Sequence, residues 1–137
     1  MFVINDMELL ARLGKHNILN SILPQFSISV SAIRLNDYSF MLKKQVQLYS
    51  QLNICCPDDD FDQWVIGKRG NASLGDLSSL HIAKTKNLSI VLSHEDVHLE
   101  SIAQKGNVIY VNFDEFIRKT VKDQHMVQMY HLLKKVA

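Results

Sequence analysis

The sequence predicts an α/β fold, a three-layer α/β/α sandwich around a mainly parallel sheet of four or five strands. Short apolar runs alternate with amphipathic stretches along the chain, which is typical of the strand–helix units that build parallel sheets. Most of these runs are apolar throughout, as expected for strands that are buried on both faces. A chain of 137 residues suits one domain, so we expect a single domain, 1–137, with a helical tail from about residue 114.

Five short runs carry the residues expected of strands. They are rich in Val, Ile, Phe and Tyr, and Asn, Asp, Pro or Gly residues punctuate the chain around them. The second run also alternates, and Pro57 stops the third. The expected strands are MFVIN, FSISVS, LNICC, LSIVLS and NVIYVNF, at residues 1–5, 26–31, 52–56, 88–93 and 107–113.

The stretches between these runs carry helix signals. Asp6 is a suitable N-cap for the helix after the first strand, Gly14 marks its end, and Pro24 ends a second short helix. Segment 67–75 has three glycines in nine residues and is predicted to be a loop. The expected helices are 7–14, 16–23, 31–52 as one long helix or two short ones, a short helix within 58–65, about 76–87, 95–106, and 114–137 with a break near Asp123.

The charge balance excludes strong long-range attraction to nucleic acid or to an acidic membrane, because the formal net charge is only +1. Contacts with nucleic acid would depend on local basic patches, and ordinary solvated charges explain the same residues equally well. The candidate patches are Lys68 with Arg69, and the tail residues Lys119, Lys122, Lys134 and Lys135.

The cysteines and the N-terminus indicate a reducing, cytoplasmic location. Cys55 and Cys56 are adjacent, which rarely permits a disulfide between them, and no second pair completes a zinc site. We expect them to lie in a short buried stretch. MFVINDMELL lacks the basic leader and long apolar core of a signal peptide. No run approaches the roughly 18 apolar residues that a membrane span needs, so we expect no membrane association.

Acidic residues follow two of the expected strands and open one helix. Asp6 follows the first strand, Glu95 and Asp96 follow the strand at 88–93, and Asp76 begins a helix that could face the same edge. The carboxyl ends of parallel strands meet at one edge, so these side chains are expected to converge. Clustered carboxylates raise one another's pKa unless a cation compensates, and Mg²⁺ prefers oxygen ligands.

Each acid also has a purely structural explanation. Asp6 and Asp76 both suit N-cap positions, where a side-chain oxygen accepts from the first free N–H groups of a helix. Glu95 and Asp96 suit the first helical turn, where the helix dipole favours acids. Only their common edge favours a metal site over these explanations.

Three segments together resemble a known family. GDLSSLHIAKTKNLSIVLSHED, residues 75–96, contains a Gly and an acid, a helix with Ala and Ile, a short apolar strand, and a Ser before acids. FVINDMELLARLGKHNILNSIL, residues 2–23, has an Asp after an apolar strand and then a Leu-rich helix. ISVSAIRLND, residues 28–37, is similar in place to a strand with an acid shortly after it. The order of these segments along the chain, over roughly residues 2–112, resembles that of the PIN domains, a family of nucleases.

The resemblance implies that Asp6 is the first metal-binding acid and Asp76 the third. Met7 replaces the Thr, Ser or Cys that usually follows the first acid. At the position of the second acid the chain has Asn36, with Asp37 beside it. A shift of one residue would place Asp37 in the site, whereas Asn36 itself could ligate through its carbonyl oxygen.

The fourth acidic position departs from the family in the same way. His94 stands where an Asp is usual, and Glu95 comes next. A His ligand would favour Mn²⁺ over Mg²⁺. The candidate metal ligands are therefore Asp6, Asn36, Asp37, Asp76, His94, Glu95 and Asp96, and the candidate catalytic acids among them are Asp6, Asp37, Asp76 and Glu95.

The resemblance implies a metal-dependent endoribonuclease that uses Mg²⁺ or Mn²⁺ to cleave an RNA backbone. In such chemistry the ion activates water and stabilises the leaving oxygen. The single-domain form is similar to the toxins of bacterial toxin–antitoxin pairs, which implies a protein antitoxin as a partner. A homodimer is a further expectation, with contributions from the apolar tail residues Val127, Met129, Leu132 and Leu133.

Two other functions stay open. Asn36 and His94 also fit a catalytically degenerate PIN-like module that acts through protein or RNA binding. Acids at strand ends also suit a phosphotransfer-receiver-like domain, but the lysine expected near a late strand end is not evident. Metal-dependent RNA cleavage separates the nuclease from the binding module.

A few further residues have both a functional and a structural explanation. His94 and His98 are four apart but lack the arrangement of a zinc-protease motif. His81 could face the cleft or solvent, and Ser78 could at most place a hydroxyl near a phosphate. Trp64 suits a core or rim position, although an exposed ring could stack on a base.

Overall fold

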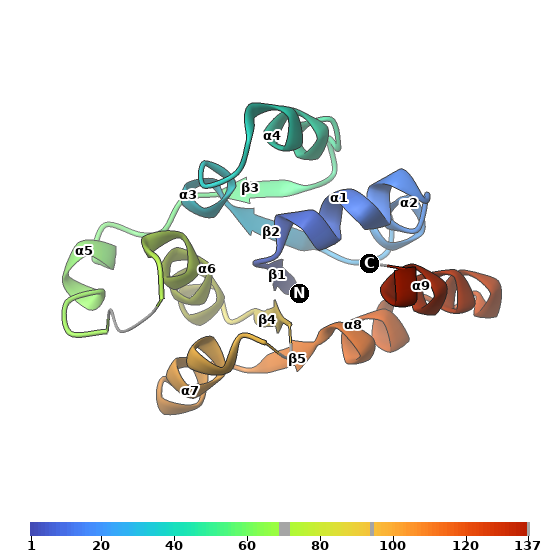
Figure 1. Cartoon of the computed structure of the whole chain (residues 1–137). Helices are drawn as coiled ribbons and strands as arrows, with labels where there is room; N and C mark the ends of the chain where they lie inside the picture. The colour runs from blue at the N-terminus through green and yellow to red at the C-terminus, as the bar shows by residue number, and fades with distance from the viewer. Residues whose placement is uncertain (69–71, 94, 137) are drawn as a thin grey trace.

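A computed structural model describes residues 1–68, 72–93 and 95–136, with side chains as far as Leu132, and it confirms the three-layer α/β/α fold (Figure 1). Within these residues the strands form one all-parallel sheet in the order β3-β2-β1-β4-β5. The strands are β1 (Phe2–Ile4), β2 (Ile28–Ser31), β3 (Asn53–Cys55), β4 (Ser89–Leu92) and β5 (Tyr110–Asn112).

The helices follow the expected order. They are α1 (Met7–Lys15), α2 (Leu19–Ile22), α3 (Ala32–Leu35), α4 (Phe40–Gln47), α5 (Phe61–Trp64), α6 (Leu74–Thr85), α7 (Val97–Lys105), α8 (Phe113–Thr120) and α9 (Gln124–Val136). Segment 31–52 forms two short helices, and Ser39 caps the second by accepting from the Leu42 N–H. The tail breaks between Thr120 and Gln124, close to the predicted position.

Two apolar clusters cover the two faces of the sheet, which is why the strands are apolar throughout. Phe2 and Ile4 of β1 pack into one cluster, with side chains from α1, α2 and α8. Val3, between them, packs into the other cluster with side chains from α6 and α7. Successive side chains of a strand point to opposite faces, so this single strand contributes to both halves of the core.

The edge strand β3 differs from the sequence-based prediction. Asn53 and Ile54 are exposed, Cys55 is half-buried and Cys56 is exposed. The prediction of a buried stretch around the two cysteines is therefore wrong. The physical reason is the position of β3 at the end of the sheet, where one side of the strand has no neighbour to cover it.

The sheet order places a topological switch point between β1 and β4. The chain adds β2 and β3 on one side of β1, then returns to add β4 and β5 on the other. After β1 it continues into α1, which packs on the first core cluster, whereas after β4 it continues into α7, which packs on the second. The two connections diverge here, and in open α/β sheets this edge is where ligands bind.

Candidate functional site

Asp6 begins α1 directly after β1, at the carboxyl edge of the sheet. Its Oδ1 accepts hydrogen bonds from the Glu8 N–H at 3.0 Å and the Leu9 N–H at 3.1 Å. The predicted N-cap is thereby confirmed. One carboxylate oxygen is used by the helix, and the group stays half-buried at the switch point.

Asp76 lies in the first turn of α6, but it is not the N-cap that the sequence suggested. Ser73 caps the helix, and the two residues form a capping box: the Asp76 N–H donates to Ser73 Oγ at 3.1 Å, and the Ser73 N–H donates to Asp76 Oδ2 at 3.3 Å. Asp76 Oδ1 accepts from Asn5 Nδ2 at 2.9 Å. The helix begins a little earlier than predicted because Ser73 has the extended backbone and free hydroxyl that a cap needs.

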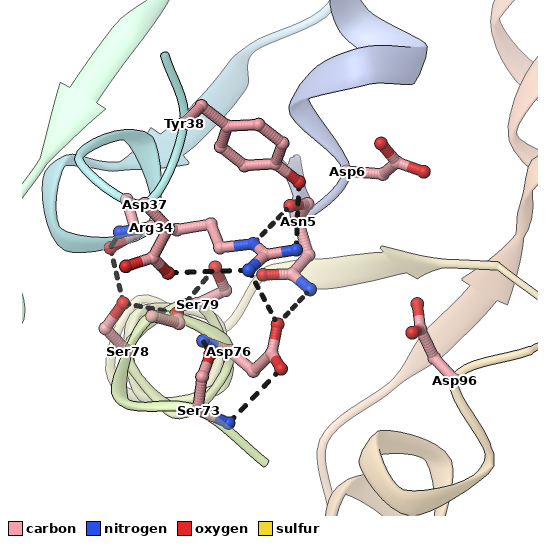
Figure 2. A network of polar contacts seen from close by, with 12 residues as sticks. Asn5, Asp6, Arg34, Asp37, Tyr38, Ser73, Asp76, Ser78, Ser79 and Asp96 are labelled. Carbon is pink, nitrogen blue, oxygen red and sulfur yellow. Dashed lines mark hydrogen bonds and ion pairs between the residues drawn. The ribbon is translucent and has the colours of Figure 1, made fainter.

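Asp96 follows β4 and begins α7. Its Oδ2 accepts from the Ser93 N–H at 3.1 Å across a turn. Burial raises the pKa of Asp96, and the negative charges of Asp76 and Asp6 raise it further, against the lowering effect of the Ser93 hydrogen bonds. The ionised form of Asp96 is therefore disfavoured by the charges of Asp76 and Asp6, although the three acids come from separate parts of the chain. Figure 2 shows them around the same part of the sheet edge.

Arg34, on α3 just after β2, occupies the middle of this polar network (Figure 2). Its Nε donates to the Asn5 carbonyl at 3.0 Å, and its Nη2 donates to the Tyr38 hydroxyl at 2.9 Å. Its Nη1 lies 3.5 Å from Asp76 Oδ1 and 3.4 Å from Asp37 Oδ2. The side chains of Arg34 and Asp76 are only 21% and 20% exposed, so solvent screens their attraction less than at an open surface.

Gly75 lets α3 and α6 approach closely enough for this network to form. A Cβ atom at Gly75 would lie 2.1 Å from Asp37 Oδ2 and 3.0 Å from the Cα of Arg34. Neither separation is tolerated without a shift, and the second involves backbone. The glycine before the acid thus has a packing role in the site.

The structure divides the remaining candidates. Asp37 joins the network through Arg34, whereas Asn36 is exposed and its Oδ1 accepts from Lys43 Nζ on α4. Glu95 is exposed in the turn before α7, with its N–H donating to Ser93 Oγ at 3.2 Å. His94 lies outside the described residues. Of the two acids after β4, Asp96 is half-buried and its pKa is raised by the charges of Asp76 and Asp6, whereas Glu95 is exposed.

Asn5, Arg34 and Tyr38 belong to the site but were not among the residues singled out from the sequence. Asn5 is 2% exposed, and its Oδ1 has no hydrogen-bond partner among the described residues. Its amide orientation is set by the bond from Nδ2 to Asp76. The sequence does contain a signal for two of them as site residues. Asn5 directly precedes Asp6 at the end of a strand, and Arg34 follows β2 by one turn.

The donor set suits a hard divalent cation. Carboxylates of Asp6, Asp76 and Asp96 and the orphaned amide oxygen of Asn5 supply the oxygen ligands that Mg²⁺ and Mn²⁺ accept. Within the described ranges, no group of three or more His, Cys, Asp and Glu side chains is already arranged to hold a metal ion. Ion binding would therefore require the carboxylates to turn toward one another, and it would compete with Arg34 for Asp76.

Ser78 and His81, for which the sequence left a functional role open, are both buried. Ser78 is fully buried and donates to the Gly75 carbonyl at 2.6 Å, so it does not lie near a surface phosphate. His81 is 1% exposed and faces neither cleft nor solvent. Its ring packs against Phe61 and Trp64, with Nε2 3.2 Å from Asp60 Oδ1, an ion-pair distance without the geometry of a hydrogen bond.

Neither the models of known protein families nor the curated proteins contain a match to this chain. Within the described residues, no helix combines the length and the apolar character that crossing a membrane requires.

Proposed function

We propose that this chain is a PIN-like, metal-dependent endoribonuclease. The single observation that carries the proposal is the placement of Asp6, Asp76 and Asp96 around the switch point of a parallel sheet, within range of one another's charge. Carboxylates that repel one another in this way gain most from a bound cation, because the ion removes the repulsion. RNA phosphates would supply further oxygen ligands to the same ion.

In this proposal Asp6, Asp76 and Asp96 hold Mg²⁺ or Mn²⁺, and Asn5 adds a neutral oxygen. The bound ion would activate water and stabilise the leaving oxygen. Glu95 stands next to Asp96 in an exposed turn, and in this proposal it would act on the attacking water. Asp37 contacts the same Arg34 nitrogen as Asp76 does, so in this proposal it orients the guanidinium instead of ligating the ion itself.

Arg34 has two roles in the proposed site. Its contacts with the Asn5 carbonyl, the Tyr38 hydroxyl and Asp76 fix the angle between the end of β1 and the start of α6. It is also a positive group beside the acids, and in this proposal a phosphate oxygen of the RNA would take the place of one of its present contacts. A guanidinium suits this task because its fork of N–H donors matches phosphate geometry.

The alternative is a catalytically degenerate PIN-like module that binds RNA or protein. One observation favours it specifically: Arg34 already compensates the charge of Asp76, so the acid does not need a metal ion to be stable. In that case the edge would be a polar binding surface, with Arg34 as its contact to phosphate.

The toxin role, with a protein antitoxin and a homodimer, is part of the same proposal, as is a cytoplasmic location. Val127 and Met129 pack against the core, which leaves less of the tail for a partner than the sequence suggested, whereas Leu132 is 62% exposed. Another apolar surface lies at α4 and the residue after it, where Phe40, Met41 and Leu48 are strongly exposed. We propose that a partner protein binds this surface in preference to the tail.

The test is cleavage of a structured RNA by the pure protein with Mg²⁺, with Mn²⁺ and with chelator. The key variant is Asp76→Asn, which keeps an oxygen for the capping box, and the matched control is Asp62→Asn, an exposed acid of α5. We expect metal-dependent cleavage by the wild type and the control, and its loss in Asp76→Asn. No cleavage by any protein would favour the binding module, and equal cleavage by Asp76→Asn would identify a contaminating nuclease.

A further inference from the structure

A concave site without any of these acids is lined by residues of α6, α7 and the turn that follows α5, and Figure 1 shows where these segments lie in the fold. Its cavity has a volume of about 490 Å³, within the range of small-molecule sites. Apolar side chains form much of its wall. They are Trp64 at the end of α5, Leu80 on α6, and Ile102 and Val108 around the end of α7. Such a wall suits a planar ring or another apolar group of a ligand.

The charged residues of this cavity have one sign. Lys68, Lys84 and Lys105 come from three different segments and line it together. Among the described residues that line it there is no aspartate or glutamate. For a chain whose net charge is only +1, three lysines without an acid are a concentrated positive site, and they select for an anion such as phosphate.

Trp64 provides a further unmet donor. Its indole Nε1 is buried and has no acceptor among the residues that the structure describes. The ring is held in place, because Lys68 Nζ lies 4.9 Å from the ring centroid and donates to the Trp64 carbonyl at 3.0 Å. Buried indole N–H groups normally find a partner, and this one would reach a ligand in the cavity only after the ring shifts, because the nitrogen itself is inaccessible here.

The cavity and the acidic edge share two helices. Asp76 and Asp96 lie at the starts of α6 and α7, and Lys84 and Lys105 lie in the last turns of the same helices. The eight residues from Asp76 to Lys84 correspond to about 12 Å along the helix axis. A nucleic acid strand can span this separation in a few nucleotides.

We propose that this cavity binds a nucleotide of single-stranded RNA that flanks the cleaved phosphate, with its phosphate between the lysines and its base against the apolar wall. The identity of the ligand as RNA rests on the proposed function, whereas the preference for a phosphate joined to a planar ring rests on the cavity alone. The site would hold the substrate at a distance from the acids and contribute to the choice of cleavage position.

Trp64 is the only tryptophan of the chain, so its fluorescence reports on this cavity directly. We would titrate the protein in chelator with adenosine monophosphate, adenosine, inorganic phosphate and a short single-stranded RNA. Variant Lys84→Gln/Lys105→Gln removes two of the charges, and Lys15→Gln/Lys119→Gln makes the same change on α1 and α8, which pack on the other face.

We expect a saturable change in Trp64 fluorescence with the nucleotide and the RNA, and weaker responses to adenosine or phosphate alone. The Lys84→Gln/Lys105→Gln variant should bind at least about tenfold more weakly, since it loses two charge-assisted hydrogen bonds to the phosphate. The control variant should bind like the wild type. No response in the wild type, or an equal response in both double variants, would overturn the inference.

The outcome is separable from that of the proposed function. Metal-dependent cleavage without any lysine-dependent fluorescence response would remove only this cavity from the account. A lysine-dependent response in a protein that cleaves nothing would keep the nucleotide site and remove the nuclease.

Discussion

The guanidinium of Arg34 lies beside the carboxylate of Asp76, with Nη1 3.5 Å from Oδ1. Both side chains are about four-fifths buried, and Asp37 approaches the same nitrogen at 3.4 Å. The central acid of the proposed metal site is thus already paired with a cation of the protein. The balance between Arg34 and a divalent ion therefore sets how tightly that ion binds.

Replacing Arg34 by Gln should strengthen Mn²⁺ binding and weaken the fold. Loss of the positive charge leaves Asp76 with more negative potential for the ion, whereas the Asn5 carbonyl and the Tyr38 hydroxyl lose their donor. We expect unfolding to become easier by about 1–3 kcal/mol, as for other partly buried polar groups that lose a partner. Calorimetric Mn²⁺ titration and urea unfolding measure the two effects.

The control for this change is Arg34→Lys, which keeps the charge and loses the forked donor. It should bind Mn²⁺ much as the wild type does, while losing part of the stability. Tighter Mn²⁺ binding in Arg34→Lys, or unchanged binding in Arg34→Gln, would mean that the charge of Arg34 does not compete with the ion.

Gly75→Ala should disrupt the packing of α3 on α6. Alanine is the better helix former, but its Cβ would lie 3.0 Å from the Cα of Arg34, where backbone must move. We expect a net loss of about 1–3 kcal/mol, as in other overpacked sites, together with weaker metal binding. Gly106→Ala is the less crowded control, because its Cβ would meet one tight contact, at 3.3 Å, whereas a Cβ at Gly75 would meet three at 3.1 Å or less. Equal losses in the two variants would argue against a special approach at Gly75.

Asp96→Asn should stabilise the protein in the absence of divalent ions. The pKa of Asp96 is raised above 3.8 in the folded protein, so the native state holds this proton more tightly than the unfolded chain does. Its contribution to the free energy of unfolding therefore falls as pH rises through the window above 3.8. The amide removes the cost of burying a charge, which is the larger effect, and the repulsion from Asp76 and Asp6, and it still accepts from the Ser93 N–H.

Thermal unfolding in chelator across a pH series measures this effect. The advantage of Asp96→Asn should be present at pH 7 and should disappear in acid, where the wild-type carboxyl is protonated. The exposed Asp62→Asn serves as the charge-matched control and should differ little from the wild type. An Asp96→Asn variant that is less stable at pH 7 would show that the acid does not carry the repulsion described above.

The sequence predicted the architecture because its signals are local. Each strand is a short apolar run. Asp6 favours the start of a helix, and Gly14 and Pro24 favour the end of one, through their own backbone and side-chain chemistry. The break of segment 31–52 into two helices depends on Ser39 as a second cap, and this is also a local signal. The exposure of Cys56 could not be read in the same way, since it depends on which strand forms the edge of the sheet.

The candidate site was less accessible because it depends on contacts between distant segments. Asp6 and Asp76 were found from their places in the chain, but the pairing of Asp76 with Arg34 spans 42 positions and has no local signature. The preference for Asp96 over Glu95 as a metal ligand depends on burial, because Asp96 is half-buried and Glu95 is exposed. His81, which the sequence left between cleft and solvent, is buried because Phe61 and Trp64 fold over it.

The most direct test is Mn²⁺ titration of the wild type, Asp6→Asn, Asp76→Asn, Asp96→Asn and the control Asp62→Asn by isothermal titration calorimetry. Asparagine keeps an acceptor at each position, so the helix cap and turns should survive the change. The account predicts a single Mn²⁺ site in the wild type and the control, and strong weakening in each of the other three variants. Equal binding in all five proteins, or no binding in the wild type, would contradict a shared cation at this edge of the sheet.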